Sequence, residues 1–125
     1  TAAEPFSLDD LCLSIVQRLQ HALAASDAEP AHLKTIGMSA GSHAVANLVS
    51  SDSPAVLSLA SNCRTRQAGV IVNARVAIDP QILEEHVQAA VRAASQSLNA
   101  TPEFLQTQSF RPGRPNPTYR YAEAV

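Results

Sequence analysis

The segment Asn62–Arg66 (NCRTR) carries the residue types best suited to chemistry. Cys63 stands directly before Arg64, and Arg66 follows two residues later. Nearby guanidinium groups favour the thiolate, the form of cysteine that acts as a nucleophile or binds a metal. A cysteine nucleophile also needs a histidine base and an oxyanion site, and no motif in the chain supplies them. An inert loop thiol is the default interpretation, and an enzyme that uses Cys63 with its flanking arginines is an alternative.

A second candidate is an anion site or partner contact. Asn73 and Arg75 fall on the mixed face of a predicted strand, whose other face is wholly apolar. Arginine binds planar anions through its fork of donors. We therefore take Asn73, Arg75, Arg64 and Arg66 as the candidate binding residues. The alternative is that this strand face meets solvent or pairs with acidic residues of the chain.

Two histidines, His32 and His43, flank a predicted hairpin and could approach one another. A metal ion needs three or four ligands. Cys63 or an acid would have to complete the set, and no spacing supports that arrangement. These three residues are therefore weak metal candidates, and solvent-facing histidines are the simpler interpretation. The chain also has no P-loop and no GxGxxG motif, so we expect no cofactor and no nucleotide hydrolysis by this chain alone.

The C-terminal segment 111–125 contains three prolines and a glycine among its first seven residues. Aromatic residues alternate with arginines around it, a pattern that can bind single-stranded RNA. Three arginines are few for that task, and the net charge of the chain is −2, which argues against a nucleic-acid partner. We predict a strap or tail beyond a domain formed by residues 1–110, and a weak RNA-binding tail is the alternative.

The elements that must position these residues are two amphipathic helices and a group of strands. Aliphatic residues recur at three- and four-residue spacing over 8–25 and 80–98, as expected for helices with one buried stripe. Ser7 and Asp79 precede the two helices as N-caps. Strands are predicted at 31–38, 43–50, 55–60 and 69–78, with a possible last strand at 104–110.

Short turns between the first strands imply an antiparallel meander, and a helix between the last two implies a right-handed crossover if they pair in parallel. The predicted fold is α+β: a two-layer sandwich, with a mostly antiparallel sheet of four to five strands and two helices on one face. An open sheet edge would permit a homo-oligomer. No apolar run reaches the length of a membrane span and no signal peptide is visible, so we expect no membrane partner and a cytoplasmic location.

Three short segments resemble a known family. Ala31–Lys34 (AHLK), followed by a glycine turn and by Ala46–Asp52 (ANLVSSD), is similar to the region after the GTPase core in some CobW-like GTPases. Val72–Arg75 (VNAR) and the following helix fit the same layout, so the resemblance covers residues 7–98. It implies an accessory domain of a metallochaperone, that is, of a metal- or cofactor-delivery GTPase. The P-loop and the Cys-rich metal motif of the GTPase core have no counterpart in this chain, so the resemblance transfers no nucleotide or metal residue.

These observations favour a non-enzymatic accessory or interaction domain. Its expected partner is another protein or a neighbouring domain. The start at Thr1 is compatible with a domain cut from a longer chain.

Overall fold

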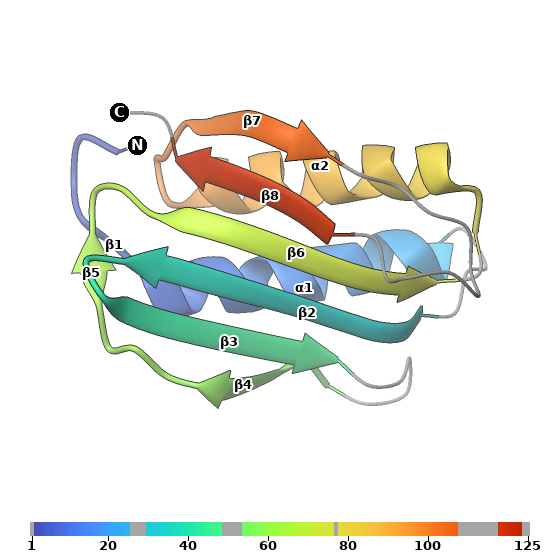
Figure 1. Cartoon of the computed structure of the whole chain (residues 1–125), viewed down its shortest axis with the longest axis horizontal. Helices are drawn as coiled ribbons and strands as arrows, with labels where there is room; N and C mark the ends of the chain where they lie inside the picture. Colours follow the sequence, from blue (N-terminus) through green and yellow to red (C-terminus); the bar gives the residue numbers. More distant parts are fainter. Residues whose placement is uncertain (1, 26–29, 49–53, 77, 108–117, 124–125) are drawn as a thin grey trace.

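The computed structural model describes residues 2–25, 30–48, 54–76, 78–107 and 118–123, and from residue 103 onward it describes the backbone. Helices α1 (Leu8–Ala25) and α2 (Pro80–Ser97) lie on one face of a six-stranded antiparallel sheet, as Figure 1 shows. The α+β sandwich predicted from the sequence is confirmed. Neither described helix combines the length and the apolar content that crossing a membrane requires.

The order of strands in the main sheet is β4-β3-β2-β6-β8-β7. Their bounds are β2 (Pro30–Ser39), β3 (Ser42–Leu48), β4 (Val56–Leu59), β6 (Gly69–Val76), β7 (Pro102–Thr107) and β8 (Thr118–Glu123). The expected meander holds for β2, β3 and β4. The next strand, β6, pairs with β2 and not with β4, so β2 lies inside the sheet.

The C-terminal segment differs from the prediction. Residues 118–123, expected within a strap or tail, form β8 between β6 and β7, so the domain extends beyond residue 110 and the sheet has six strands. Thr118, Tyr119 and Tyr121 are types that favour strands, but the prolines before them obscured this pattern. Since β8 is antiparallel to both neighbours, β6 and β7 run in the same direction without pairing. The expected crossover therefore runs from β6 through α2 to β7, and β8 lies between these two parallel strands.

A second, two-stranded sheet joins β1 (Phe6–Ser7) to β5 (Arg64–Thr65). Both strands are too short to show a periodic pattern, so neither is among the strands predicted from the sequence. Ser7 also caps α1, since its Oγ accepts a hydrogen bond from the Asp10 backbone nitrogen at 3.2 Å. Asp79 caps α2 in the same way, accepting from the Gln81 nitrogen at 2.8 Å. Both predicted caps are thus confirmed.

The core lies between the helices and the sheet. Helix α1 buries an aliphatic stripe that includes Leu11, Ile15 and Leu19. The strands beneath it present small residues, which let the helix approach closely. At Gly37 in β2, a Cβ atom would lie 2.6 Å from Cys12 Sγ and 2.7 Å from Leu8 Cδ1. Glycine is therefore required at this position by the contact with α1.

Candidate docking face of the sheet

Asp9, in the first turn of α1, holds the loop that leads into β5. Its carboxylate accepts hydrogen bonds from Ser61 N at 2.8 Å, from Ser61 Oγ at 2.7 Å and from Asn62 N at 2.9 Å. Partial burial acts to raise the pKa of Asp9, but these hydrogen bonds outweigh it, and the pKa lies below its ordinary value. The loop bends at Asn62, whose φ of 52° lies in the left-handed region that asparagine tolerates. We call this contact between α1 and the loop the clasp.

Cys63 and Arg64 belong to the same clasp. The Cys63 carbonyl accepts a hydrogen bond from Leu8 N at 3.0 Å, and Arg64 Nη2 donates to the Pro5 carbonyl at 3.0 Å. The half-buried side chain of Cys63 packs against the core, and its thiol has no hydrogen bond among the described residues.

The other cysteine, Cys12, is fully buried on the side of α1 that faces the sheet. Desolvation, together with the negative charge of Asp9, raises the pKa of Cys12 to about 12. The thiol is therefore protonated at neutral pH and acts as a small apolar side chain. This role is the one expected from its place in the helix stripe.

The four predicted binding residues do not form one site. Arg66 lies just before β6, whereas Asn73 and Arg75 lie towards the far end of that strand. Arg75 is six residue steps beyond Gly69, which corresponds to about 20 Å along a strand. Arg64 lies in β5, outside the main sheet. These four candidate residues therefore do not lie together, because closeness in sequence to β6 did not bring the loop arginines to the far end of that strand.

The metal candidates are also separated. His32 pairs with Arg75 near the start of β2, whereas His43 pairs with Met38 at the hairpin end. These two positions of β2, His32 and Met38, are six residue steps apart, again about 20 Å. The described part of the chain contains no group of three or more His, Cys, Asp or Glu side chains that could hold a metal ion. Flanking a hairpin did not bring the two histidines together, because they stand at opposite ends of its strands.

The tail proposed for RNA binding lies partly outside the described residues, which do not include 108–117. Its last part is the strand β8. Tyr119, Arg120 and Tyr121 there pair with successive residues of β6. The backbone of this part is thus engaged in the sheet.

The face of the sheet that points away from α1 and α2 is covered by none of the described elements (Figure 1). We call it the open face. Its side chains alternate with those of the core, as the strand pleat requires. In β2, Leu33 and Thr35 are fully buried beneath the helices, whereas Lys34 and Ile36 are half-buried on the open face.

Cross-strand register arranges the open face in rows. We name the first the apolar row; it crosses four adjacent strands and consists of Leu59, Val45, Ile36 and Ile71. A bulge brings Leu59 into this row, because Ser58 is the extra residue of β4. Ser58 Oγ accepts a hydrogen bond from Asn47 Nδ2 at 2.6 Å and donates to the Val45 carbonyl at 3.3 Å. These bonds fix the bulge and leave the Leu59 side chain 49% exposed.

We name the next row along the strands the polar row; it consists of Asn47, Lys34 and Asn73, and the apolar residue Val56, 54% exposed, stands at its β4 end. Beyond it, His32 pairs with Arg75 across β2 and β6. The open face therefore changes along the strands from aliphatic to cationic. The sequence predicted the mixed character of β6, but it could not show that β2 would extend the pattern with Lys34 and Ile36.

The charged side chains are distributed unevenly between the open face of the sheet and the helices. Among the side chains that the structure describes, the open face carries Lys34 and Arg75 and no carboxylate. The helices carry four carboxylates against two guanidinium groups: Asp9, Asp10, Glu84 and Glu85 against Arg18 and Arg92. The described open face is thus positive and the helix layer negative, which favours an acidic partner on the open face.

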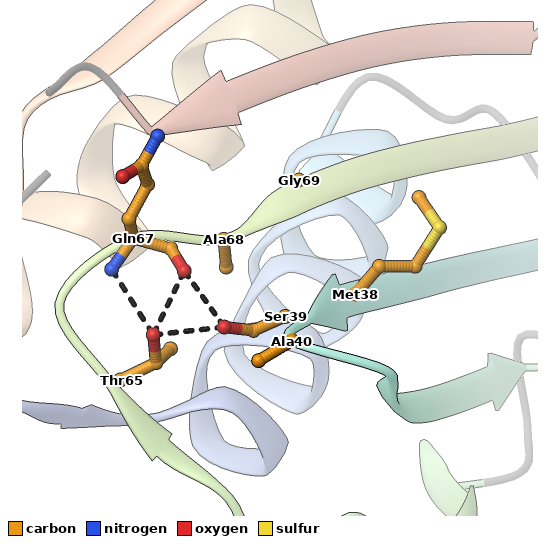
Figure 2. A pocket seen from close by; sticks show the side chains of 7 residues that line it. All are labelled: Met38, Ser39, Ala40, Thr65, Gln67, Ala68 and Gly69. Atoms are coloured by element: carbon orange, nitrogen blue, oxygen red, sulfur yellow. Dashed lines mark hydrogen bonds between the residues drawn. The ribbon is translucent and has the colours of Figure 1, made fainter.

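A hollow of about 460 Å³ opens where β2 ends and β6 begins (Figure 2). Ser39 Oγ lies 2.8 Å from Thr65 Oγ1 and 2.9 Å from the Gln67 carbonyl oxygen. The Thr65 hydroxyl also donates to that carbonyl at 2.8 Å and accepts from Gln67 N at 3.1 Å. These polar groups bond to one another around the hollow, so we assign it no ligand.

Comparisons with protein-family models, with curated proteins and with solved structures found no match to this chain. Function is therefore argued from the geometry of the chain itself. The open face is the candidate site, since it combines a partly exposed apolar row with the cationic side chains of Lys34 and Arg75.

Proposed function

We propose that this chain is a non-enzymatic accessory domain that binds a protein partner through its open face. The observation that carries the proposal is the uncovered face itself, with aliphatic side chains on four adjacent strands beside Lys34 and Arg75. Contiguous exposed apolar surface with a polar rim marks protein interaction sites. Charged groups beside the apolar centre give such a site specificity and a faster encounter.

We further propose that the partner is the catalytic domain of a metal- or cofactor-delivery GTPase. The described parts of the segments that resemble CobW-like accessory regions lie on three adjacent strands, β2, β3 and β6; residues 49–52 of the second segment are outside the described residues. They meet in the polar row, where Lys34 lies between Asn47 and Asn73. The resemblance and the candidate docking surface therefore involve the same part of the sheet, which supports this class of partner.

The role of the clasp supports a non-catalytic function. The Cys63 carbonyl bonds to Leu8 at the start of α1, and the Arg64 side chain bonds to Pro5 just before β1, so both residues hold the loop in place. The residues with the best chemical potential in the sequence thus have a structural explanation. An accessory domain needs no nucleophile of its own, because its neighbour supplies the chemistry.

The test is a titration of the ¹⁵N-labelled chain with the purified GTPase domain of a CobW-like protein, in its GDP and GTP-analogue forms. We expect amide shift changes at Lys34, Ile36 and Ile71 and none on the outer faces of α1 and α2. The double variant Lys34→Glu with Arg75→Glu should weaken binding by at least about tenfold, because it reverses both charges that face the partner.

The matched control is Arg18→Glu with Arg92→Glu, which makes the same change in net charge on the exposed sides of the helices. It should keep the affinity within about twofold of the original, since rim and remote charges contribute little to binding. Shift changes confined to the helices, or no association with either nucleotide form, would refute the proposed partner and surface.

A further inference from the structure

The open face also defines the kind of partner element that it fits. We infer that it binds an amphipathic helix, with apolar side chains on the apolar row and carboxylates on the flank next to Lys34 and Arg75. This inference rests on the proposed interaction function and names the chemistry of the partner at the same site.

The apolar row has the dimensions of one helix stripe. It crosses four strands, so its ends are three strand spacings apart, about 14 Å. Three turns of α-helix span about 16 Å. In β2 and β6 the apolar row is only one side chain wide, because the next residues on the open face, Lys34 and Asn73, already belong to the polar row. A narrow apolar stripe with polar residues along its flank is the surface that an amphipathic helix presents.

A strand is a poorer occupant than a helix. An extended segment laid across the sheet would leave its backbone N–H and C=O groups without partners, whereas a helix satisfies its own. Addition at the sheet edge is also opposed at β4, which is four residues long, contains the Ser58 bulge and follows Pro54. Short, bulged edges with a nearby proline resist pairing with another strand. The partner therefore meets the face and not this edge.

Charge complementarity determines the orientation of the bound helix relative to the two sides of the apolar row. Lys34 and, one register further, the His32–Arg75 pair lie on one side of the apolar row. On the other side, the residues of β2, β3 and β6 whose side chains the structure describes are Met38, His43 and Gly69, which include no lysine, arginine or carboxylate. Carboxylates of a docked helix would meet Lys34 and Arg75 on the first side, whereas the second side offers no lysine or arginine among these side chains. The helix is thus expected with its acidic flank towards Lys34.

The test uses two helix-stabilised synthetic peptides of three to four turns and the full chain. Both peptides have leucine in one stripe; one has glutamate along one flank of the stripe and its twin has lysine there. We expect the glutamate peptide to shift the amides of the apolar and polar rows at low salt, and the lysine twin to bind at least about tenfold more weakly. In the variant Lys34→Glu with Arg75→Glu, the preference should reverse in favour of the lysine twin.

Ile36→Asn provides a second readout, because it removes the centre of the apolar row without changing charge. It should weaken both peptides by a similar factor. Equal affinity of the two peptides, or shift changes over α1 and α2, would overturn the inference. If the GTPase domain binds the open face and neither peptide does, the helix inference fails and the proposed function stands. If the glutamate peptide binds as expected and the GTPase domain does not, the proposed partner fails and the inferred chemistry of the face stands.

Discussion

The two faces of the sheet use the same strands for different purposes. Beneath α1 the strands present Gly37, Ala44 and Ala46, and the helix packs so closely that a methyl group at Gly37 would meet Cys12. On the open face, alternate residues of the same strands form the apolar and polar rows, and no described element packs on them. Stability and binding are therefore assigned to alternate residues. A change in one set should leave the other set largely intact.

The largest effect should come from exchanging a covered residue for alanine. Leu33 is fully buried beneath the helices, whereas Ile36, three residues further along β2, is half-buried on the open face. We expect Leu33→Ala to lower the free energy of unfolding by about 3 kcal/mol, through lost transfer energy and the cavity that remains. Ile36→Ala should cost about 1 kcal/mol or less, because its site is open to water on one side.

Urea unfolding at constant pH measures both values, and the midpoint should change without a change in slope. Equal losses for the two variants would show that Ile36 is packed as tightly as Leu33. The distinction between the two faces would then fail.

A second comparison uses two glycines of the same sheet. Gly37→Ala should lower the free energy of unfolding by about 2 kcal/mol, because the new Cβ overlaps Cys12 Sγ and Leu8 Cδ1. At Gly69 the nearest atom to a new Cβ is Met38 Cε, at 3.8 Å. Gly69→Ala should therefore be neutral, or stabilise by up to about 0.5 kcal/mol through a less flexible unfolded chain.

The cause of the Gly37 effect can be tested with Cys12→Ala. If crowding is the cause, Cys12→Ala should be less destabilising in the Gly37→Ala background than in the original protein, which a double-mutant cycle measures. Strict additivity would contradict a direct contact between the two positions.

Much of the covered layer could be predicted from the sequence. The stripes of both helices, their Ser7 and Asp79 caps and the alternation in β6 are local patterns, and the structure confirms them. Local patterns do not specify which strands become neighbours. The pairing of β6 with β2 and the insertion of β8 depend on contacts between residues far apart in the chain.

The candidate site illustrates the same limit. Asn73 and Arg75 were found because one strand carries both in alternation. Lys34, which completes the polar row, stands in a different strand and could be placed beside Asn73 only once the register was known. Leu59 enters the apolar row through a bulge, and no periodic pattern predicts a bulge of one residue.

A smaller effect is expected at the clasp, which links α1 to β5. Asp9→Asn should cost about 1 kcal/mol at pH 7, because it replaces a charged acceptor of three hydrogen bonds with a neutral one. The pKa of Asp9 is lowered in the folded protein. Its contribution is therefore fully present above the unfolded pKa of about 3.9 and is lost as the pH falls through the lower folded value.

Unfolding measurements from pH 7 to pH 2 check this window. The difference between the original protein and Asp9→Asn should shrink below about pH 4. Asp10→Asn, which makes the same charge change at the next and more exposed position, is the control. A pH dependence that is equal in both variants would assign the effect to the charge of the helix end and not to the clasp.

The smallest effect is expected at Lys34, and it bears most directly on the comparison of the two faces. Lys34→Glu reverses a charge on the open face, where the register neighbours are the neutral residues Asn47 and Asn73. The free energy of unfolding should change by no more than about 0.5 kcal/mol, as for surface positions outside packed features. A loss above about 1 kcal/mol in urea unfolding would mean that Lys34 contributes to the fold. Weaker binding of Lys34→Glu with Arg75→Glu would then result from an altered sheet. Unchanged stability would instead assign the weaker binding to a lost contact with the partner.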